Sequence, residues 1–200
     1  MRSNGKGTLL LVIALAVTSS IPVSHAQVAE LKGFDLQVKT WAEECRKEVI
    51  DQMELLITSG KLSLGQLFDT FYIPIPGTTP QKFNTQYDKY LDESIQVILD
   101  RYLDKSDKLV FVVATDKNGY VPTHNTKYSQ PLTGDKDKDL VGNRTKRLFN
   151  DRTGLAAAKN TEPYILQKYN RETGEQMADL SVPIMIRNQH WGAIRIGYKP

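Results

Sequence analysis

The run from Leu109 to Ala114 constrains the fold most, because it is continuously apolar and rich in β-branched and aromatic residues. Such a run is typical of a strand that is covered on both faces. The next four residues, Asp116 to Gly119, are turn formers, and Gly119 can adopt the positive φ that a bulged turn requires. Pro122 lacks an amide proton, so we expect a short returning strand or an edge strand that ends at His124.

The N-terminus has the three parts of a secretory signal peptide. Arg2 and Lys6 form a basic start, residues 9–17 form an apolar core, and Ser24-His25-Ala26 has the small-x-small pattern of a cleavage site. The apolar core is about half as long as a membrane-spanning helix. We therefore predict export to the periplasm with cleavage after Ala26.

Charge and length narrow the possible partners. Removal of residues 1–26 leaves 174 residues, enough for one domain with an extension, and lowers the formal net charge from +3 to +1. This near balance argues against nucleic acid as a partner, and against a membrane surface bound mainly by charge.

A long amphipathic helix is predicted before the central strand. Apolar residues recur at steps of three and four from Phe34 to Leu56, and the helix should end near Ser59-Gly60. Its stripe can pack against a sheet in the same chain, or against a second copy to form a homodimer. Cys45, the single cysteine, lies on this stripe, where it is either a small buried apolar residue or a thiol available for an intermolecular bridge.

The remaining pattern predicts an α+β fold. Ser63 should start a short helix, three prolines at 74, 76 and 80 should extend the chain, and a second helix should run over 87–102 with Asn84 or Thr85 as its cap. We expect a solvated loop over 125–140 and short helical pieces over 147–149 and 155–158. Three antiparallel strands should follow, over 164–169, 177–186 and 191–198, with compact turns at 171–174 and 187–190.

Several segments together resemble a module of bacterial methyl-accepting chemotaxis proteins, a PAS-like sensor of the Cache type. The similarity spans roughly residues 50–198, and its segments are Leu67-Phe-Asp69, Tyr72-Ile-Pro-Ile-Pro-Gly-Thr78, Asp116-Lys-Asn-Gly-Tyr-Val-Pro-Thr-His-Asn125, Tyr128-Ser-Gln-Pro131, residues 143–155 and His190-Trp-Gly192.

The resemblance implies an antiparallel sheet of five to six strands, long N-terminal helices and a helical excursion over one face. The expected layout is a signal peptide at 1–26, an N-terminal helical region at 27–105 and a PAS-like sensor domain at 106–200. Chemoreceptors also carry membrane spans and a cytoplasmic coiled coil, and we recognise neither here. The resemblance therefore implies an exported domain that signals through a partner, such as a membrane receptor or a kinase.

Catalysis is not predicted. After cleavage His124 and His190 are the only histidines, and neither has a metal-ligand spacing. The sequence has no nucleophile elbow and no phosphate-cradling glycine loop. We expect no enzyme activity and no bound cofactor, although the two histidines leave a haem or redox protein open as an alternative.

A pocket for a small molecule is expected between the sheet and the excursion. Arginine suits a carboxylate through its planar fork of donors, and aromatic side chains would form the walls. The candidate residues are His124, Arg144, Arg147, Asp151, Tyr164, Gln167, Tyr169 and Trp191. The first hypothesis is a sensor that binds a small molecule such as an organic anion; the alternative is an interaction protein whose pocket is filled by its own side chains.

These candidates have simpler interpretations too. The two arginines can form surface ion pairs with Asp139 or Asp151, and the aromatic residues can be plain core. Tyr164 and Tyr169 lie on opposite faces of a regular strand, so only one of them can face a cavity on one side of the sheet.

Overall fold

The computed structural model describes residue 1 and residues 30–170 and 175–200. Residues 2–26 of the predicted signal peptide and the predicted turn at 171–174 lie outside the described residues. Residues 31–200 form one compact unit, which contains residues 31–105 of the predicted helical region and the whole of the predicted sensor domain. The division between these two stays a prediction. No helix in the described ranges combines the length and apolarity that a membrane crossing needs.

The elements follow one another in an α+β order. They are α1 (Gly33–Thr58), α2 (Leu64–Leu67), β1 (Ile73–Ile75), β2 (Lys82–Asn84), α3 (Asp88–Leu103), β3 (Leu109–Asp116), β4 (Tyr120–Val121), the 3-10 helix η1 (Thr126–Tyr128), α4 (Lys136–Gly142), β5 (Arg147–Leu148), α5 (Arg152–Lys159), β6 (Ile165–Asn170), β7 (Gln176–Ile186) and β8 (Gln189–Tyr198).

The main sheet is antiparallel, with the strand order β3-β8-β7-β6. The α+β class and the three C-terminal strands are confirmed. The sheet has four strands among the described residues, fewer than the five to six expected, because β1 pairs with β2 and β4 pairs with β5 in separate two-stranded ladders.

The short returning strand is present as β4, but its predicted hairpin pairing with β3 is wrong. The Asp116 carboxylate accepts the backbone N–H groups of Asn118 and Tyr120, each at 2.9 Å, and this bonding turns the chain away from β3. β4 then pairs with β5. On β3, the amide of Val112 donates instead to the side-chain oxygen of Asn125 at 2.9 Å. A side chain therefore satisfies an edge amide that the hairpin would have paired.

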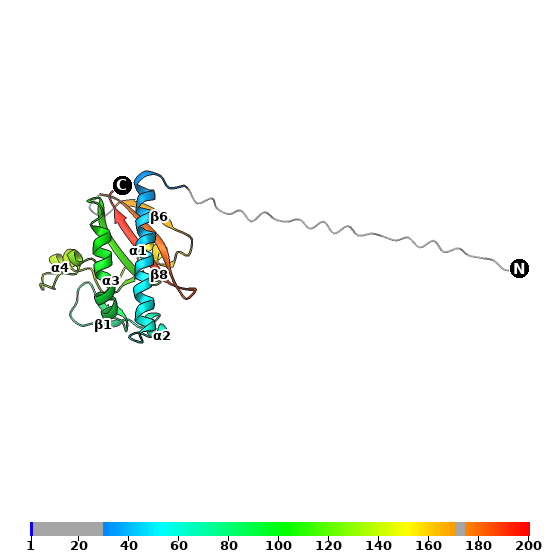
Figure 1. Ribbon diagram of the computed structural model, residues 1–200. Helices are drawn as coiled ribbons and strands as arrows, with labels where there is room; N and C mark the ends of the chain where they lie inside the picture. Colours follow the sequence, from blue (N-terminus) through cyan, green and yellow to red (C-terminus); the bar gives the residue numbers. More distant parts are fainter. Residues whose placement is uncertain (2–29, 171–174) are drawn as a thin grey trace. The chain divides into compact units, whose positions relative to one another are not determined.

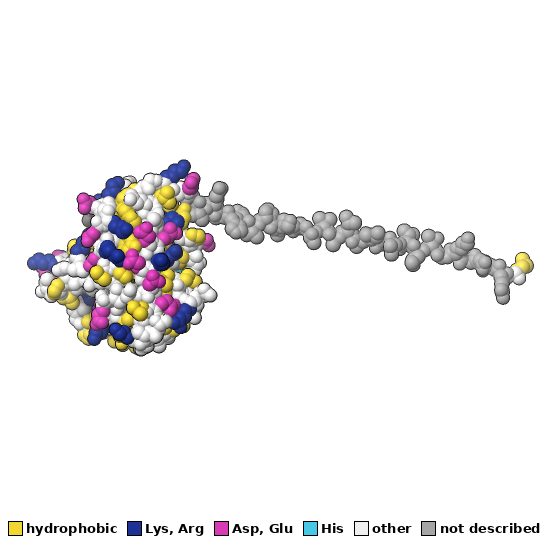
Figure 2. All heavy atoms as spheres, viewed as in Figure 1, with side chains coloured by type: hydrophobic (Ala, Val, Ile, Leu, Met, Phe, Trp, Pro, Cys, Tyr) yellow, Lys and Arg dark blue, Asp and Glu magenta, His cyan; other side chains and the backbone are white. Residues whose placement is uncertain are grey.

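Helices α1 and α3 cover one face of the main sheet (Figure 1). The predicted stripe of α1 is confirmed as buried, and it packs within the chain against β7 and β8. Cys45 is part of this core. On the outer face of the helices, Figure 2 shows basic and acidic side chains intermingled, among them the pair between Lys105 of α3 and Glu44 of α1. A homodimer through α1 stays a prediction.

Three local predictions need correction. The solvated loop contains α4, because the Asp135 carboxylate caps it by accepting the N–H groups of residues 137 and 138. The helical piece at 147–149 is instead strand β5, which pairs with β4. Neither Asn84 nor Thr85 caps α3; the Asp88 carboxylate accepts the amide of Thr85 at 3.1 Å. The helices α1, α2 and α5 begin or lie where the sequence places them.

The two faces of the sheet carry different side chains, since neighbours along a strand point in opposite directions. On β3, Val112 and Ala114 belong to the core under the helices, whereas Phe111 and Val113 point to the other face. Helix α5 packs on β7 and β8. The candidate site occupies the side of the sheet to which Phe111 and Val113 point.

Candidate functional site

A cavity of about 630 Å³ lies between this face of the sheet and the segment that runs from β4 to α5. Its size falls in the range of small-molecule sites. Its lining residues are Val110, Phe111, Val113, Val121, His124, Tyr128, Leu140, Val141, Arg144, Arg147, Phe149, Asp151, Thr153, Tyr169, Asn170, Met177 and Arg195.

Apolar side chains line much of the cavity. Phe111 and Val113 come from β3, and Met177 comes from β7. Leu140 and Val141 of α4 also line it, although 43 % and 64 % of their surfaces are exposed. Exposed apolar groups at the edge of a cavity can be covered by the apolar part of a ligand.

Two arginines form a cationic wall, a name we use for Arg144 and Arg147. Their guanidinium carbons lie 5.2 and 5.1 Å from the ring centre of Phe149. Burial, followed by repulsion from Arg144, lowers the pKa of Arg147 to about 10. Within the described ranges, no carboxylate forms a salt bridge with Arg147; its Nη1 donates a long hydrogen bond to the carbonyl of Leu140, at 3.5 Å.

Lys82 adds a third cation behind the wall. Its ammonium donates to the carbonyl and side-chain oxygens of Asn143 at 3.2 and 2.5 Å, and to the carbonyl of Thr145 at 2.6 Å. All three acceptors are neutral. Burial first, and then repulsion from Arg147 and Lys146, lowers the pKa of Lys82 to about 8. Lys82 therefore ties β2 to the start of the wall and adds positive charge there.

His124 is buried at the edge of the same cavity. Its Nδ1 accepts the backbone N–H of Asn125 at 2.8 Å, which places the proton of the neutral ring on Nε2. Burial, followed by the charges of Arg144 and Lys127, holds the His124 pKa well below its ordinary value. The ring lies 4.9 Å from that of Tyr128 in an edge-to-face arrangement. His124 is therefore a neutral N–H donor.

The floor of the cavity contains a buried ion pair. Nη2 of Arg195, on β8, donates to Oδ2 of Asp179, on β7, at 2.5 Å. Asp179 has 0 % exposed surface and Arg195 has 6 %. Burial alone would lower the pKa of Arg195, but the Asp179 carboxylate raises it above its ordinary value. Among the described residues, Arg195 Nε, Asp179 Oδ1 and the hydroxyl of Ser181 have no hydrogen-bond partner.

Five of the eight predicted site residues line the cavity: His124, Arg144, Arg147, Asp151 and Tyr169. Asp151 also caps α5, because its Oδ1 accepts the N–H groups of Thr153 and Gly154 at 3.0 Å each. The role of these five residues in ligand binding stays a prediction.

The other three predicted residues lie outside the lining. Tyr164 is on the side of α1, where Lys39 Nζ lies 5.8 Å from its ring centre. Gln167 donates to the carbonyl of Thr153 at 3.0 Å. The opposite facing of Tyr164 and Tyr169 follows the alternation expected from the sequence.

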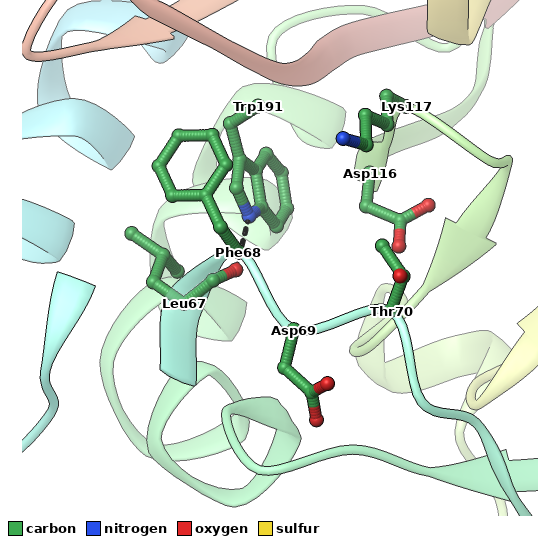
Figure 3. A pocket seen from close by; sticks show the side chains of 7 residues that line it. All are labelled: Leu67, Phe68, Asp69, Thr70, Asp116, Lys117 and Trp191. Atoms are coloured by element: carbon green, nitrogen blue, oxygen red, sulfur yellow. Dashed lines mark hydrogen bonds between the residues drawn. The ribbon is translucent and has the colours of Figure 1, made fainter. Parts of the chain in front are cut away.

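Trp191 is in the core on the side of the helices. Its indole N–H donates to the carbonyl of Leu67 at 2.9 Å, drawn as the dashed line in Figure 3 beside the ring of Phe68. These residues and Asp116 surround a space of about 10 Å³, which is enough for one water molecule. The simpler interpretation of Trp191, core packing, describes its position.

Sequence reasoning missed Arg195 and Lys82. A signal for Arg195 was present, because a single arginine interrupts the apolar strand from Trp191 to Tyr198, and an acid interrupts the preceding strand at Asp179. A charge in a buried strand needs a partner. Lys82 gave no comparable signal, since it lies in a proline-rich connection where lysine is usually solvated.

Comparisons with known proteins give structural neighbours only. No protein-family model matches the chain, and no curated protein matches it. Solved structures that match include an extracellular ligand binding receptor from Desulfohalobium retbaense DSM5692, with 13 % identity, a TM-score of 0.38, and 83 % of this chain and 26 % of that chain covered. Another is the ligand-binding domain of the amino acid chemoreceptor PctC of Pseudomonas aeruginosa PAO1, with 14 % identity, a TM-score of 0.29, and 83 % and 64 % covered.

This chain therefore spans about a quarter of the first neighbour and less than two thirds of the second.

Proposed function

We propose that this protein is a ligand-sensing domain whose cavity binds a small organic anion. The observation that carries the proposal is the positive charge around the cavity. Arg147 and Lys82 donate hydrogen bonds to neutral oxygens, and burial first, followed by repulsion between neighbouring cations, lowers the pKa values of both.

Arg147 and Lys82, whose hydrogen bonds go to neutral oxygens, repel each other in the folded protein, and an anion bound beside them relieves that repulsion. Arg147 can bind a carboxylate through two parallel N–H bonds, and the neutral His124 can add a third donor. The open volume beside these groups also favours a ligand site over a pocket filled by side chains.

Export to the periplasm and signalling through a membrane receptor or kinase are part of the proposal. Export is supported by the N-terminal sequence pattern. The need for a partner comes from the resemblance to a sensor module. A pull-down from membranes of the native host, with and without added ligand, tests the partner.

Thermal unfolding tests anion binding. The purified protein is heated with a broad panel of organic anions, neutral analogues and amines, each in large excess. Because a ligand that binds only the folded state raises Tm, at least one anion should raise it by several degrees, and the neutral analogues should not. The Arg147→Met variant should lose this shift.

Arg152→Met is the matched control. Arg152 is an exposed residue of α5 outside the cavity lining, so its loss removes the same charge and leaves the site intact. If no anion raises Tm, or if Arg147→Met and Arg152→Met respond alike, the proposal fails.

A further inference from the structure

We propose that Arg195 is a second anchor in this cavity, so that the ligand is a carboxylate whose other polar group is a neutral hydrogen-bond acceptor such as a hydroxyl or carbonyl. This inference rests on the proposed function, because it assumes that an anion occupies the cavity. It adds the chemical class of the ligand and a specificity residue on the sheet.

Arg195 reaches the cavity from the middle of the sheet. It lies on β8, opposite Val113 of β3 and Ser181 of β7. Its side chain lines the cavity, and its guanidinium carbon lies 5.9 Å from the ring centre of Phe111. The surrounding strands hold this group in place, whereas the cationic wall lies on the segment that crosses the sheet.

The guanidinium of Arg195 has hydrogen-bond donors that can bind a ligand. It carries five N–H groups, and the described residues accept a hydrogen bond from one of its nitrogens, Nη2. Nε has no partner among the described residues. A buried donor without an acceptor costs free energy, so an acceptor on a ligand gains more here than it would at an exposed site.

The partner of Arg195 decides what kind of acceptor fits. Asp179 is fully buried one strand away and neutralises the guanidinium. The floor therefore offers donors without net positive charge. A second carboxylate of the ligand would lose its water there and would also meet the negative charge of Asp179, whereas a hydroxyl or carbonyl would not.

The two ends of the site thus differ in charge. Arg147 donates to a neutral carbonyl, that of Leu140, while Arg195 is paired with a carboxylate. Phe111, Val113 and Met177 lie among the lining and suit an apolar carbon chain. A monoanion with an apolar body and one neutral polar group matches both ends.

Isothermal titration calorimetry on the purified protein tests this. The probes are straight-chain acids of three to six carbons, each length in three forms: the unsubstituted monocarboxylate, the ω-hydroxy acid and the α,ω-dicarboxylate. Using several lengths avoids an assumption about the span between the two ends. At the best length the hydroxy acid should bind at least ten-fold more tightly than the other two forms.

Two variants assign the preference to the floor. Arg195→Met should remove the advantage of the hydroxy acid over the unsubstituted acid and leave weak binding of both. Asp179→Asn keeps the size of the side chain but leaves Arg195 uncompensated, so the preference should move at least ten-fold toward the dicarboxylate. Circular dichroism checks that each variant folds. If neither variant folds, the order of affinities of the three forms of acid for the unmodified protein still tests the role of Arg195.

The outcomes separate this inference from the proposed function. If the dicarboxylate binds best to the unmodified protein and Arg147→Met abolishes its binding, the anion site stands and the role of Arg195 is wrong. If no acid of the series binds, the inference about Arg195 is wrong. The thermal unfolding with the broader anion panel then tests separately whether the cavity binds an anion.

Discussion

Replacement of Asp116 gives the sharpest test of the architecture, because four donors converge on its carboxylate. Oδ2 accepts the hydroxyl groups of Tyr72 and Tyr87 at 2.5 and 3.0 Å, and Oδ1 accepts the amides of Asn118 and Tyr120 at 2.9 Å each. Asp116 is 3 % exposed at the end of β3. It therefore joins the sheet to α3 and to the segment before β1.

The loss of stability expected for Asp116→Ala can be calculated from the hydrogen-bond donors that lose their acceptor. The bonds from Tyr87 and Tyr120 are buried, whereas those from Tyr72 and Asn118 are partly buried, so water can replace the carboxylate there. Each buried donor left without a partner costs about 1–3 kcal/mol. We expect a loss of about 2–6 kcal/mol in the free energy of unfolding, a large share of the stability of an ordinary domain.

Asp116→Asn is the matched variant. It keeps an oxygen for the two backbone amides and removes only the acceptor for the tyrosines. One of the two buried donors, Tyr87, loses its acceptor, so we expect about half the loss seen for Asp116→Ala, measured by urea unfolding at pH 7. The reasoning is refuted if Asp116→Ala unfolds within about 1 kcal/mol of the original protein, or if the two variants are equally destabilised.

The pH dependence of stability, compared between the original protein and Asp116→Asn, gives a second test. Burial raises the Asp116 pKa above its ordinary value of 3.8, even though the hydrogen bonds lower it. The folded state then holds this proton more tightly than the unfolded state does. The contribution of Asp116 to stability is therefore complete below about pH 4 and declines as the pH rises through the folded pKa. The stability of the original protein relative to Asp116→Asn should therefore fall as the pH rises from about 4 through the folded pKa of Asp116. A rise would contradict a raised pKa for Asp116.

Three further predictions concern single side chains. Trp191→Phe leaves the buried carbonyl of Leu67 without its donor and should cost about 1–3 kcal/mol in urea unfolding; a neutral effect would contradict this. The imidazole of His124 should stay neutral at pH 6 by NMR, and Arg147→Met should raise its pKa, since Arg147 is among the charges that lower it; an unchanged titration would count against the cationic wall. Cys45 is buried and its pKa is raised, first by burial, so a thiol reagent should label it only after urea is added; rapid labelling of the folded protein would contradict its position.

Local sequence patterns predicted the helices and strands that are specified by residues within a single short segment. The stripe on α1 recurs every three to four residues and the capping pattern at Ser63 lies within four residues, so both could be found by inspection. Likewise, the alternation in β6 correctly separates Tyr164 from Tyr169. Five residues of the cavity lining were also predicted, because arginine suits an anion and aromatic side chains suit the walls of a pocket.

Contacts between distant segments decided the rest. The choice of β5 as the partner of β4, and the turn that the Asp116 carboxylate stabilises, depend on groups that no short window of sequence contains. Trp191 looks like a pocket residue in the sequence, yet its N–H finds the carbonyl of Leu67, 124 positions away, and it packs into the core.

The sequence by itself thus determined the α+β class, the long helix and the three C-terminal strands, because each is a repeat over a few residues. The tertiary structure alone decided which charges meet. Arg195 is neutralised by Asp179 on the next strand, while Arg147 donates to the neutral carbonyl of Leu140. Electrostatic energies depend on distance and burial in space, and the order of residues along the chain does not specify these.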